Sequence, residues 1–260
     1  MSRTIDWTYE DGVYELTLAT PPCNEIGLKM LAALENFLDQ VDPKAHTLIV
    51  RSGLRSGFCA GADLRELYKG LCETPDDEQE PRLRDFIRRI HRVMDGLDML
   101  PLTTVAVVSG VCFGGGFELA LTADMIVAEK SARFCFPELR LGVVPGFGGI
   151  PRLRRDVGNG LIRDLLLSGR SIGAKKALAA GLVSQVVANG EGLGVARSLA
   201  AQSAKFDQTA RKAAKAFIKK LPADELAEER ELFVRLARGP ALKAALKKFV
   251  ESTDLRPYLP

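Results

Sequence analysis

Apolar residues in the first two thirds of the chain recur in the patterns of buried strands and amphipathic helices. Continuous apolar runs, which are typical of strands buried on both faces, occupy residues 47–50, 105–108 and 125–128. Two further strand-like segments, residues 7–10 and 13–18, flank the turn dipeptide Asp11-Gly12 and predict a hairpin. Helical spacing occurs in residues 30–41 and 83–97. Strands therefore alternate with helices in this part of the chain.

The pattern then changes to helices. Segments with helical spacing are residues 151–157, 161–167, 174–180, 194–204, 209–221, 223–237 and 240–250, with one strand at residues 182–187. Only helices follow residue 187. We therefore place a soft boundary near residues 189–192 and divide the chain into a core, residues 1–190, and a C-terminal helical region, residues 191–260.

Local signals before the long helix are weaker. Asp63 is expected to cap a short helix that extends through Tyr68. Residues 70–80 (GLCETPDDEQE) are acidic and interrupted by proline, which favours a mobile connection. His46 and His91 have no second ligand or nucleophile at a suggestive spacing, so we interpret both as structural.

Composition excludes several classes of protein. The net charge of +3 comes from 36 basic and 33 acidic residues that are interspersed, so charge alone indicates neither a nucleic-acid partner nor a membrane surface. No apolar run approaches the ~18–20 residues of a membrane-spanning helix, and the first residues lack the apolar segment of a signal peptide. We therefore expect a cytoplasmic protein. The five cysteines contain no CxxC pair, which disfavours disulfides and a structural zinc site.

Two short loops rich in small residues each precede a predicted helix. They are residues 59–63 (CAGAD) and residues 114–118 (GGGFE). Small residues let a ligand approach the backbone, and the first N–H groups of a helix have no partner within the helix. Two such groups pointing at one position would form an oxyanion hole for an enolate or a tetrahedral anion. A tight strand-to-helix turn explains the glycine run equally well.

Competing motifs fail on their spacing or context. Neither glycine run extends to GxGxxG, and no GxxxxGK[ST] occurs, which argues against a dinucleotide-binding fold and a phosphate-binding NTPase loop. One GxSxG string contains Ser171, but a helical segment precedes it and both histidines come earlier in the chain. We interpret Ser171 as a loop residue.

Glu118 and Glu138 are the candidates for acid–base chemistry because each lies in a mostly apolar setting. An apolar pocket disfavours the ionised form, moves the carboxyl pKa towards neutrality and suits proton transfer. Two such groups could hold one water molecule between them. The alternative for each is a buried ion pair with a nearby basic residue: Lys130, Arg133 or Arg140.

Taken together, four segments resemble the crotonase, or enoyl-CoA hydratase/isomerase, superfamily. They are residues 58–64 (FCAGADL), 114–120 (GGGFELA), 136–142 (FPELRLG) and 145–149 (PGFGG), the last followed by Arg152-Leu153. All four in this order are highly specific, and the resemblance is strong from about residue 13 to residue 187. It implies an α/β fold with a crotonase-like ββα superhelix (spiral) core. The C-terminal all-helical region would build a trimer or a dimer of trimers.

The resemblance also implies a site and a substrate class, an acyl thioester of coenzyme A. The N–H groups of Ala62 and Gly115 would bind the thioester oxygen, and Glu118 and Glu138 match the catalytic glutamates. Residues that would line the coenzyme A path are Ala60, Ala62, Asp63, Leu64 and Arg65. Coenzyme A would be part of the substrate, so neither a separate cofactor nor a metal is expected.

The presence of both glutamates favours a hydratase that adds water reversibly across a 2-enoyl-CoA to give a 3-hydroxyacyl-CoA. Glu118 would activate the water and Glu138 would supply the proton at the α-carbon. Some isomerases and ring-processing enzymes of the same superfamily keep both glutamates and are the alternatives. An acyl-carrier-protein substrate is not distinguished from coenzyme A.

The chain also departs from the family pattern. Phe117 and Phe147 occupy positions where smaller residues are common, and Ile150-Pro151 replaces a polar pair. If the two rings face the acyl pocket, they shorten it or suit a branched or flat acyl group; if not, they belong to the core.

A second class of function is an RNA-binding or inactive partner protein of the same superfamily. The intact set of Ala62, Gly115, Glu118 and Glu138 argues against an inactive partner, and RNA binding rests on one basic stripe. Its members are Arg211, Lys212, Lys215, Lys219 and Lys220. The modest net charge argues against RNA, and solvation of a helix face explains the stripe. We therefore expect no nucleic-acid partner. Lys247 or Lys248 is a candidate for a phosphate contact, with helix solvation as the alternative.

Overall fold

Two sheets lie at the centre of the computed structural model, which describes residues 4–252. The six-stranded sheet has the order β1 (Ile5–Glu10), β2 (Val13–Leu18), β3 (Thr47–Ser52), β5 (Thr103–Val108), β7 (Met125–Glu129) and β10 (Gln185–Val187). The four-stranded sheet has the order β4 (Gly57–Cys59), β6 (Val111–Phe113), β8 (Arg133–Cys135) and β9 (Ile172–Gly173). Both are mixed, because β1–β2 and β8–β9 are antiparallel and the other pairs are parallel.

Successive pairs of strands build a spiral. β3 and β4, then β5 and β6, then β7 and β8 each place one strand in the large sheet and the next in the small sheet. Helical segments return the chain between these pairs: α2 (Leu64–Glu73), α3 (Asp76–Asp98) and α4 (Gly115–Ala120). The runs predicted as doubly buried strands form β3, β5 and β7, whose central residues are buried.

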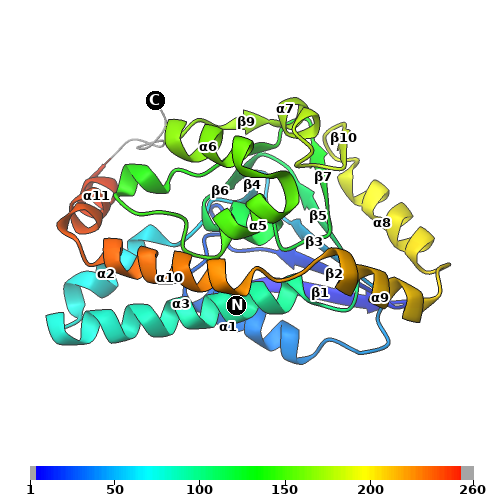
Figure 1. Cartoon of the computed structure of the whole chain (residues 1–260), viewed down its shortest axis with the longest axis horizontal. Helices are drawn as coiled ribbons and strands as arrows, with labels where there is room; N and C mark the ends of the chain where they lie inside the picture. The colour runs from blue at the N-terminus through cyan, green and yellow to red at the C-terminus, as the bar shows by residue number, and fades with distance from the viewer. Residues whose placement is uncertain (1–3, 253–260) are drawn as a thin grey trace.

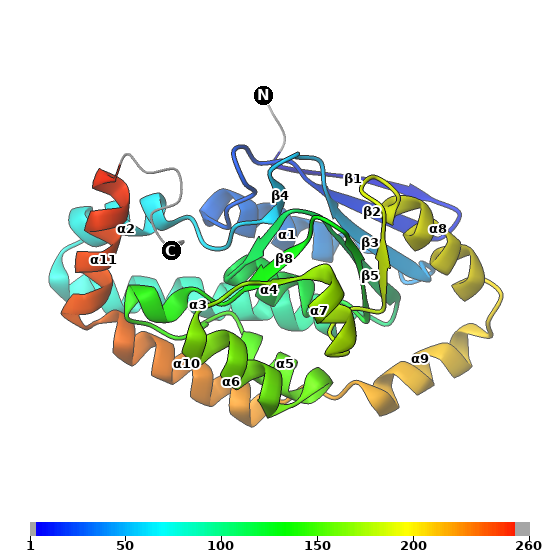
Figure 2. The ribbon, with the colours of Figure 1, turned by 90° about the horizontal axis from the view of Figure 1, so that it is seen from above.

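The helices enclose the two sheets. The remaining ones are α1 (Leu28–Asp39), η1 (Glu138–Leu141), α5 (Gly149–Val157), α6 (Asn159–Ser168), α7 (Ala174–Ala179), α8 (Gly192–Ser203), α9 (Gln208–Ile218), α10 (Ala223–Ala237) and α11 (Pro240–Glu251). Figure 1 shows α10 running along α3 and α11 beside α2. Seen from above, in Figure 2, the C-terminal helices pass around the sheets from α8 to α11. The predicted α/β crotonase fold with C-terminal helices is therefore confirmed.

The prediction of a loop over residues 70–80 was wrong. α2 continues to Glu73, α3 begins at Asp76, and only Thr74 and Pro75 separate them. The acidic residues lie in the first turn of α3, where the helix dipole favours negative charge. Gln79 donates to the carbonyl oxygens of Leu71 and Thr74, at 3.2 and 3.1 Å, and so closes the junction. The predicted cap is confirmed, because the Asp63 carboxylate accepts the N–H groups of Arg65 and Glu66 at 3.1 and 2.9 Å.

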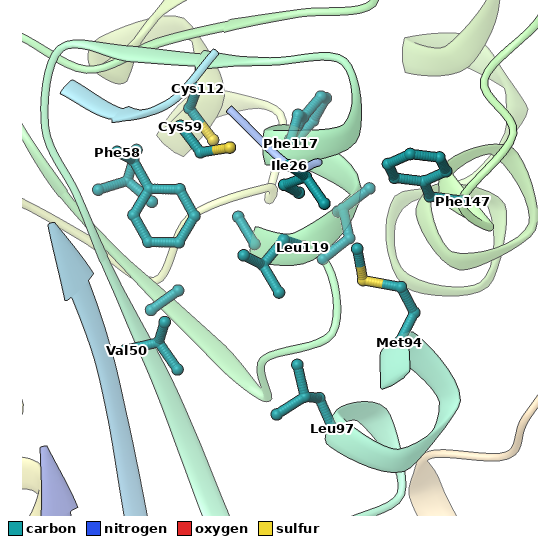
Figure 3. Packing of buried hydrophobic residues seen from close by; sticks show 14 of the residues in the cluster. Ile26, Val50, Phe58, Cys59, Met94, Leu97, Cys112, Phe117, Leu119 and Phe147 are labelled. Carbon is teal, nitrogen blue, oxygen red and sulfur yellow. The ribbon is translucent and has the colours of Figure 1, made fainter. Parts of the chain in front are cut away.

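A continuous apolar core fills the space between the sheets and α1, α3 and α4. Figure 3 shows part of it, with Phe58, Cys59 and Cys112 on one side and Met94 and Leu97 on the other. Three cysteines (Cys59, Cys112 and Cys135) are buried and all five are free thiols, as predicted. This core fixes α4, whose first turn carries Glu118.

Candidate active site

Two of the predicted loops meet at the start of α4. A Cβ atom added to Gly61 would lie 3.3 Å from the Gly115 nitrogen, and one added to Gly115 would lie 3.5 Å from the Ala62 nitrogen. Gly114 precedes α4 with a φ of +48°, a conformation that side-chain-bearing residues rarely adopt. Because Gly115 is the first residue of α4, its N–H has no acceptor within the helix. The structure thus brings the two proposed oxyanion donors side by side.

Glu118 lies in the first turns of α4 and is almost fully buried. Its Oε1 accepts the N–H groups of Phe147 and Gly149, at 2.7 and 2.8 Å. Burial raises the pKa of Glu118 to about 7, although these N–H groups and Arg152 act in the opposite direction. The alternative, an ion pair of Glu118 with Lys130, Arg133 or Arg140, is not formed within the described part of the chain. Glu118 can therefore change its protonation state near neutral pH.

Glu138 begins η1 on the other side of the glycine run. A Cβ atom on Gly114 would lie 2.7 Å from Glu138 Oε1, so the carboxyl group lies directly against the loop. Glu138 Oε2 is buried and has no hydrogen-bond partner among residues 4–252. Burial and then the charge of Glu118 raise the pKa of Glu138 well above its ordinary value. A buried carboxyl oxygen without a partner is rare in folded proteins and points to a ligand or a water molecule.

Three buried ionisable residues hold the segment after Pro145, and one of them, Glu229, was not a predicted site residue. Glu229 of α10 accepts the N–H groups of Gly148 and Ile150, at 2.7 and 2.9 Å. Glu229 is 5% exposed, and burial and Glu118 raise its pKa well above the ordinary value. Its position in the helical C-terminal region, far along the chain from the glycine loops, gave no signal in the sequence.

His91 and Arg152 bind the carbonyl groups of the same segment. His91 Nε2 lies 2.8 Å from the Gly146 oxygen, and Arg152 Nη1 donates to the Phe147 and Gly148 oxygens, both at 3.2 Å. Arg152 is fully buried and ion-paired with Asp98 and Asp95 of α3. The structural interpretation of His91 agrees with this contact, and His46 lies 2.9 Å from the Thr47 hydroxyl and 3.0 Å from the Asp11 oxygen. Arg152 was noticed only as part of a motif.

The two unusual phenylalanines have different surroundings. Phe117 is fully buried and packs against Phe134 and Phe136, at ring-centroid distances of 5.3 and 4.7 Å. Phe147 faces Phe86 of α3, at 6.0 Å, and a Cβ atom on Gly115 would touch its ring. In Figure 3, Phe147 lies on the Met94 side of the core, away from Phe58 and Cys59. The core interpretation thus holds for Phe117.

Phe147 also forms part of a cavity wall. The cavity has a volume of about 590 Å³ and lies between α2 and α3, with Ala62, Phe86, Phe147 and Phe233 among the residues that line it. The Phe147 ring lies against Gly115 and borders the cavity, and Ala62 lines the same cavity, so the cavity reaches the proposed oxyanion donors.

The remaining residues proposed for coenzyme A cluster around the start of α2. Ala60 donates its N–H to the Cys23 oxygen at 2.9 Å, Asp63 caps α2, and Leu64 is the first residue of that helix. The Arg65 guanidinium lies over the ring of Phe249 in α11, 5.2 Å from its centroid. They adjoin Ala62, but nothing in their contacts alone selects an adenine or pantetheine group.

Three of the five residues of the basic stripe form ion pairs or hydrogen bonds with other residues of the chain. Lys215 and Lys219 both contact the Asp124 carboxylate, at 2.8 and 2.9 Å, and Lys219 also pairs with Asp98. Arg211 donates to the Pro101 oxygen at 3.0 Å. The stripe is therefore not a free basic surface, and the solvation explanation was wrong for these three residues. No described helix is long and apolar enough to cross a membrane.

Comparison with known proteins identifies the family. The Enoyl-CoA hydratase/isomerase family pattern matches residues 8–256. Human mitochondrial methylglutaconyl-CoA hydratase is 36% identical over 160 residues, which is 61% of this chain and 45% of the relative. Carnitinyl-CoA dehydratase of Salmonella paratyphi B is 35% identical over 185 residues, 70% of this chain and 67% of the relative. This chain thus spans less than half the length of the human relative.

Solved structures agree on the fold. An enoyl-CoA hydratase from Bacillus halodurans superposes with a TM-score of 0.85 at 24% identity, over 94% of this chain and 99% of that one. At this identity the likeness concerns the fold alone. The family match across nearly the whole chain carries the assignment: the protein belongs to the enoyl-CoA hydratase/isomerase, or crotonase, family.

Proposed function

We propose that the protein is an enoyl-CoA hydratase that adds water reversibly across the double bond of a 2-enoyl-CoA. The observation that carries this proposal is the pair of buried carboxyl groups, Glu118 in α4 and Glu138 against Gly114, the residue that precedes α4. A hydratase needs a base for the water and an acid for the α-carbon, and both groups have raised pKa values. The names of the two relatives, a hydratase and a dehydratase, support the same reaction class.

The proposed reaction starts at the thioester carbonyl, which accepts the N–H groups of Ala62 and Gly115. Both N–H donors to Glu118 use Oε1, so Oε2 is the oxygen that we assign to the water molecule. Glu118 takes a proton from the water as its oxygen bonds to the β-carbon, and the π electrons move towards the thioester oxygen. The α-carbon of this enolate then takes a proton from Glu138. Exchange of a proton between the two carboxyl groups and solvent restores the starting state.

The oxyanion donors would stabilise the charge that develops on the thioester oxygen. Loss of one such donor typically reduces kcat by about 10²–10³. The donors here are backbone N–H groups held by the core, so they are already in position before the substrate binds. Binding of coenzyme A along Ala60, Asp63, Leu64 and Arg65 is part of the proposal, and an isomerase is the alternative reaction.

The acyl group would be short, branched or flat. The Phe147 ring lies against Gly115 and narrows the space next to the oxyanion donors. The cavity between α2 and α3, which Ala62 and Phe147 also line, has an apolar wall that includes Leu67, Leu71 and Leu83. A second polar group on the acyl chain would meet Arg82 or Arg89, which also line the cavity.

We also propose that copies of this chain assemble as a trimer or a dimer of trimers through α9. Phe217 and Ile218 are each 78% exposed, and Phe206 just before the helix is 52% exposed. Figure 2 shows α9 at the outer edge of the molecule. A change of Phe217 and Ile218 to aspartate should reduce the mass in analytical ultracentrifugation to that of a single chain. A monomeric wild type would refute the assembly.

A cytoplasmic location stays a prediction.

The test of the activity is hydration of crotonyl-CoA, followed by the loss of the enoyl-thioester absorbance. Wild type should turn over rapidly, and Glu118→Gln and Glu138→Gln should each lose activity about 10²–10⁴-fold. Glu228→Gln, an exposed change on α10, is the control with the same change of charge. Turnover that needs Glu118 but not Glu138 would instead assign an isomerase-like reaction with a single base. A wild type that binds but never hydrates enoyl-CoA thioesters would refute the proposal.

A further inference from the structure

Two carboxylates share four consecutive backbone N–H groups, those of residues 147–150. Glu118 accepts the N–H groups of Phe147 and Gly149, at 2.7 and 2.8 Å. Glu229 accepts the two others in alternation, with one carboxylate oxygen on each, at 2.7 and 2.9 Å. The two glutamates approach the start of α5 from different helices, α4 and α10. Each therefore fixes the backbone to which the other is bound.

Stability alone does not explain Glu229. Its carboxylate is 5% exposed and has no lysine, arginine or histidine within 4.0 Å among residues 4–252. The neighbouring charge of Glu118 disfavours ionisation of Glu229 as well. Burial of a carboxylate next to another carboxylate is unfavourable, and the N–H groups at the start of a helix can be bound by a neutral cap. The structure thus retains a carboxylate at position 229 although its burial is unfavourable.

The contacts suggest what this group does. The position of Glu118 depends on the loop before α5 and on the start of that helix, because both N–H donors to its Oε1, Phe147 and Gly149, lie there. Glu229, with the Arg152 bonds to the Phe147 and Gly148 oxygens, immobilises that loop from the opposite side. A displacement of about 1 Å of a reacting group can reduce the rate by about 10²-fold.

We propose that Glu229 is a positioning residue, which acts on Glu118 through the N–H groups of Gly148 and Ile150. The proposal makes helix α10, and hence the C-terminal region, a structural part of the active site. It rests on the proposed hydratase function for its kinetic readout only. The group does not touch the reacting atoms, and no set of three or more metal-binding side chains in the described residues offers a metal site instead.

The kinetic test compares Glu229→Gln with its exposed neighbour, Glu228→Gln. The glutamine keeps one carbonyl oxygen but turns an NH₂ group towards the other N–H donor, so one of the two bonds is lost. We expect kcat for crotonyl-CoA hydration to fall at least about tenfold, with KM within about threefold of wild type. Glu228→Gln should match wild type. A kcat for Glu229→Gln within about threefold of wild type would overturn the proposal.

A second readout does not depend on the reaction. The backbone amide proton resonances of Phe147 and Gly149, which bind Glu118 and not Glu229, should move in Glu229→Gln and stay unchanged in Glu228→Gln. If wild type has no hydratase activity, the proposed function fails and these resonances alone decide: moved signals support the positioning role, and unmoved signals overturn it.

A folding failure is also informative. If Glu229→Gln does not fold, Glu229→Asp, which keeps the charge but is one methylene shorter, is tested by the same two measurements with the same expected results. Failure of both variants to fold would show that Glu229 is needed for the fold itself and would overturn the proposal.

Discussion

Replacement of Glu118 by glutamine should make the protein more stable than wild type as the pH rises. Both N–H donors bind Oε1, so a glutamine oxygen at that position keeps both bonds and only the titration is removed. The pKa rises from an ordinary 4.5 to about 7 on folding because of burial. At about 1.4 kcal/mol per pKa unit, this difference corresponds to about 3 kcal/mol.

The sign follows from linkage. A carboxyl group whose pKa is raised by folding contributes stability below its unfolded pKa, and this contribution is lost as the pH rises through the folded pKa. Wild type should therefore lose about 3 kcal/mol relative to Glu118→Gln between pH 4.5 and a pH above 7. Glutamine does not titrate, so the difference reports the Glu118 charge, both directly and through its effect on the pKa values of Glu138 and Glu229.

The measurement is the free energy of unfolding from denaturant titrations of both proteins, at matched concentration, from pH 4.5 to pH 8. Glu228→Gln, on the surface of α10, should show no comparable change with pH relative to wild type. A difference between wild type and Glu118→Gln that stays flat within about 1 kcal/mol over this range would refute the inference that burial disfavours the Glu118 charge.

Three further predictions concern acyl size, the buried ion pairs and the glycine loop. Phe147→Ala should raise the ratio of kcat/KM for a branched enoyl-CoA to that for crotonyl-CoA about tenfold, because the ring borders both Gly115 and the cavity. An unchanged ratio would exclude Phe147 from selection of the acyl group. Arg152→Met should lower the free energy of unfolding by about 3–5 kcal/mol in urea titrations, because Asp98 stays buried with fewer partners. A loss of less than about 1 kcal/mol would contradict this prediction. Gly116→Ala should lower the melting temperature, because its Cβ would lie 2.3 Å from the Cys59 oxygen, whereas Gly160→Ala in α6, with nothing within 4 Å, should not.

The sequence was a good guide wherever one local pattern decides the structure. Apolar runs predicted β3, β5 and β7, and Asp63 predicted the start of α2, because strand burial and helix capping depend on a few adjacent residues. Reliance on local composition also produced the wrong prediction of a loop around Pro75. Its composition is typical of a loop, but the same carboxylates are favourable in the first turn of a helix.

The site was only partly predictable, because some of the side chains that hold it come from distant segments of the chain. The two loops and the two glutamates each belong to a short local motif, and the family resemblance of these motifs identified them. Glu229 and His91 are each more than fifty residues from the segment they bind. Lys219 was grouped with a basic surface, although its partners, Asp98 and Asp124, come from other elements. Contacts of this kind depend on the tertiary fold.

The different surroundings of Glu118 and Glu138 give a physical reason for the different roles that we propose for them. Two N–H groups and Arg152 stabilise the charged form of Glu118, which limits the rise of its pKa to about 7. Glu138 Oε2 has no donor within the described residues, and burial, followed by the charges of Glu118 and Glu229, raises the pKa of Glu138 well above its ordinary value. At neutral pH the first group is therefore the better base and the second the better acid. Carboxyl groups whose environments separate their pKa values in this way can divide the two proton transfers of a hydration between them.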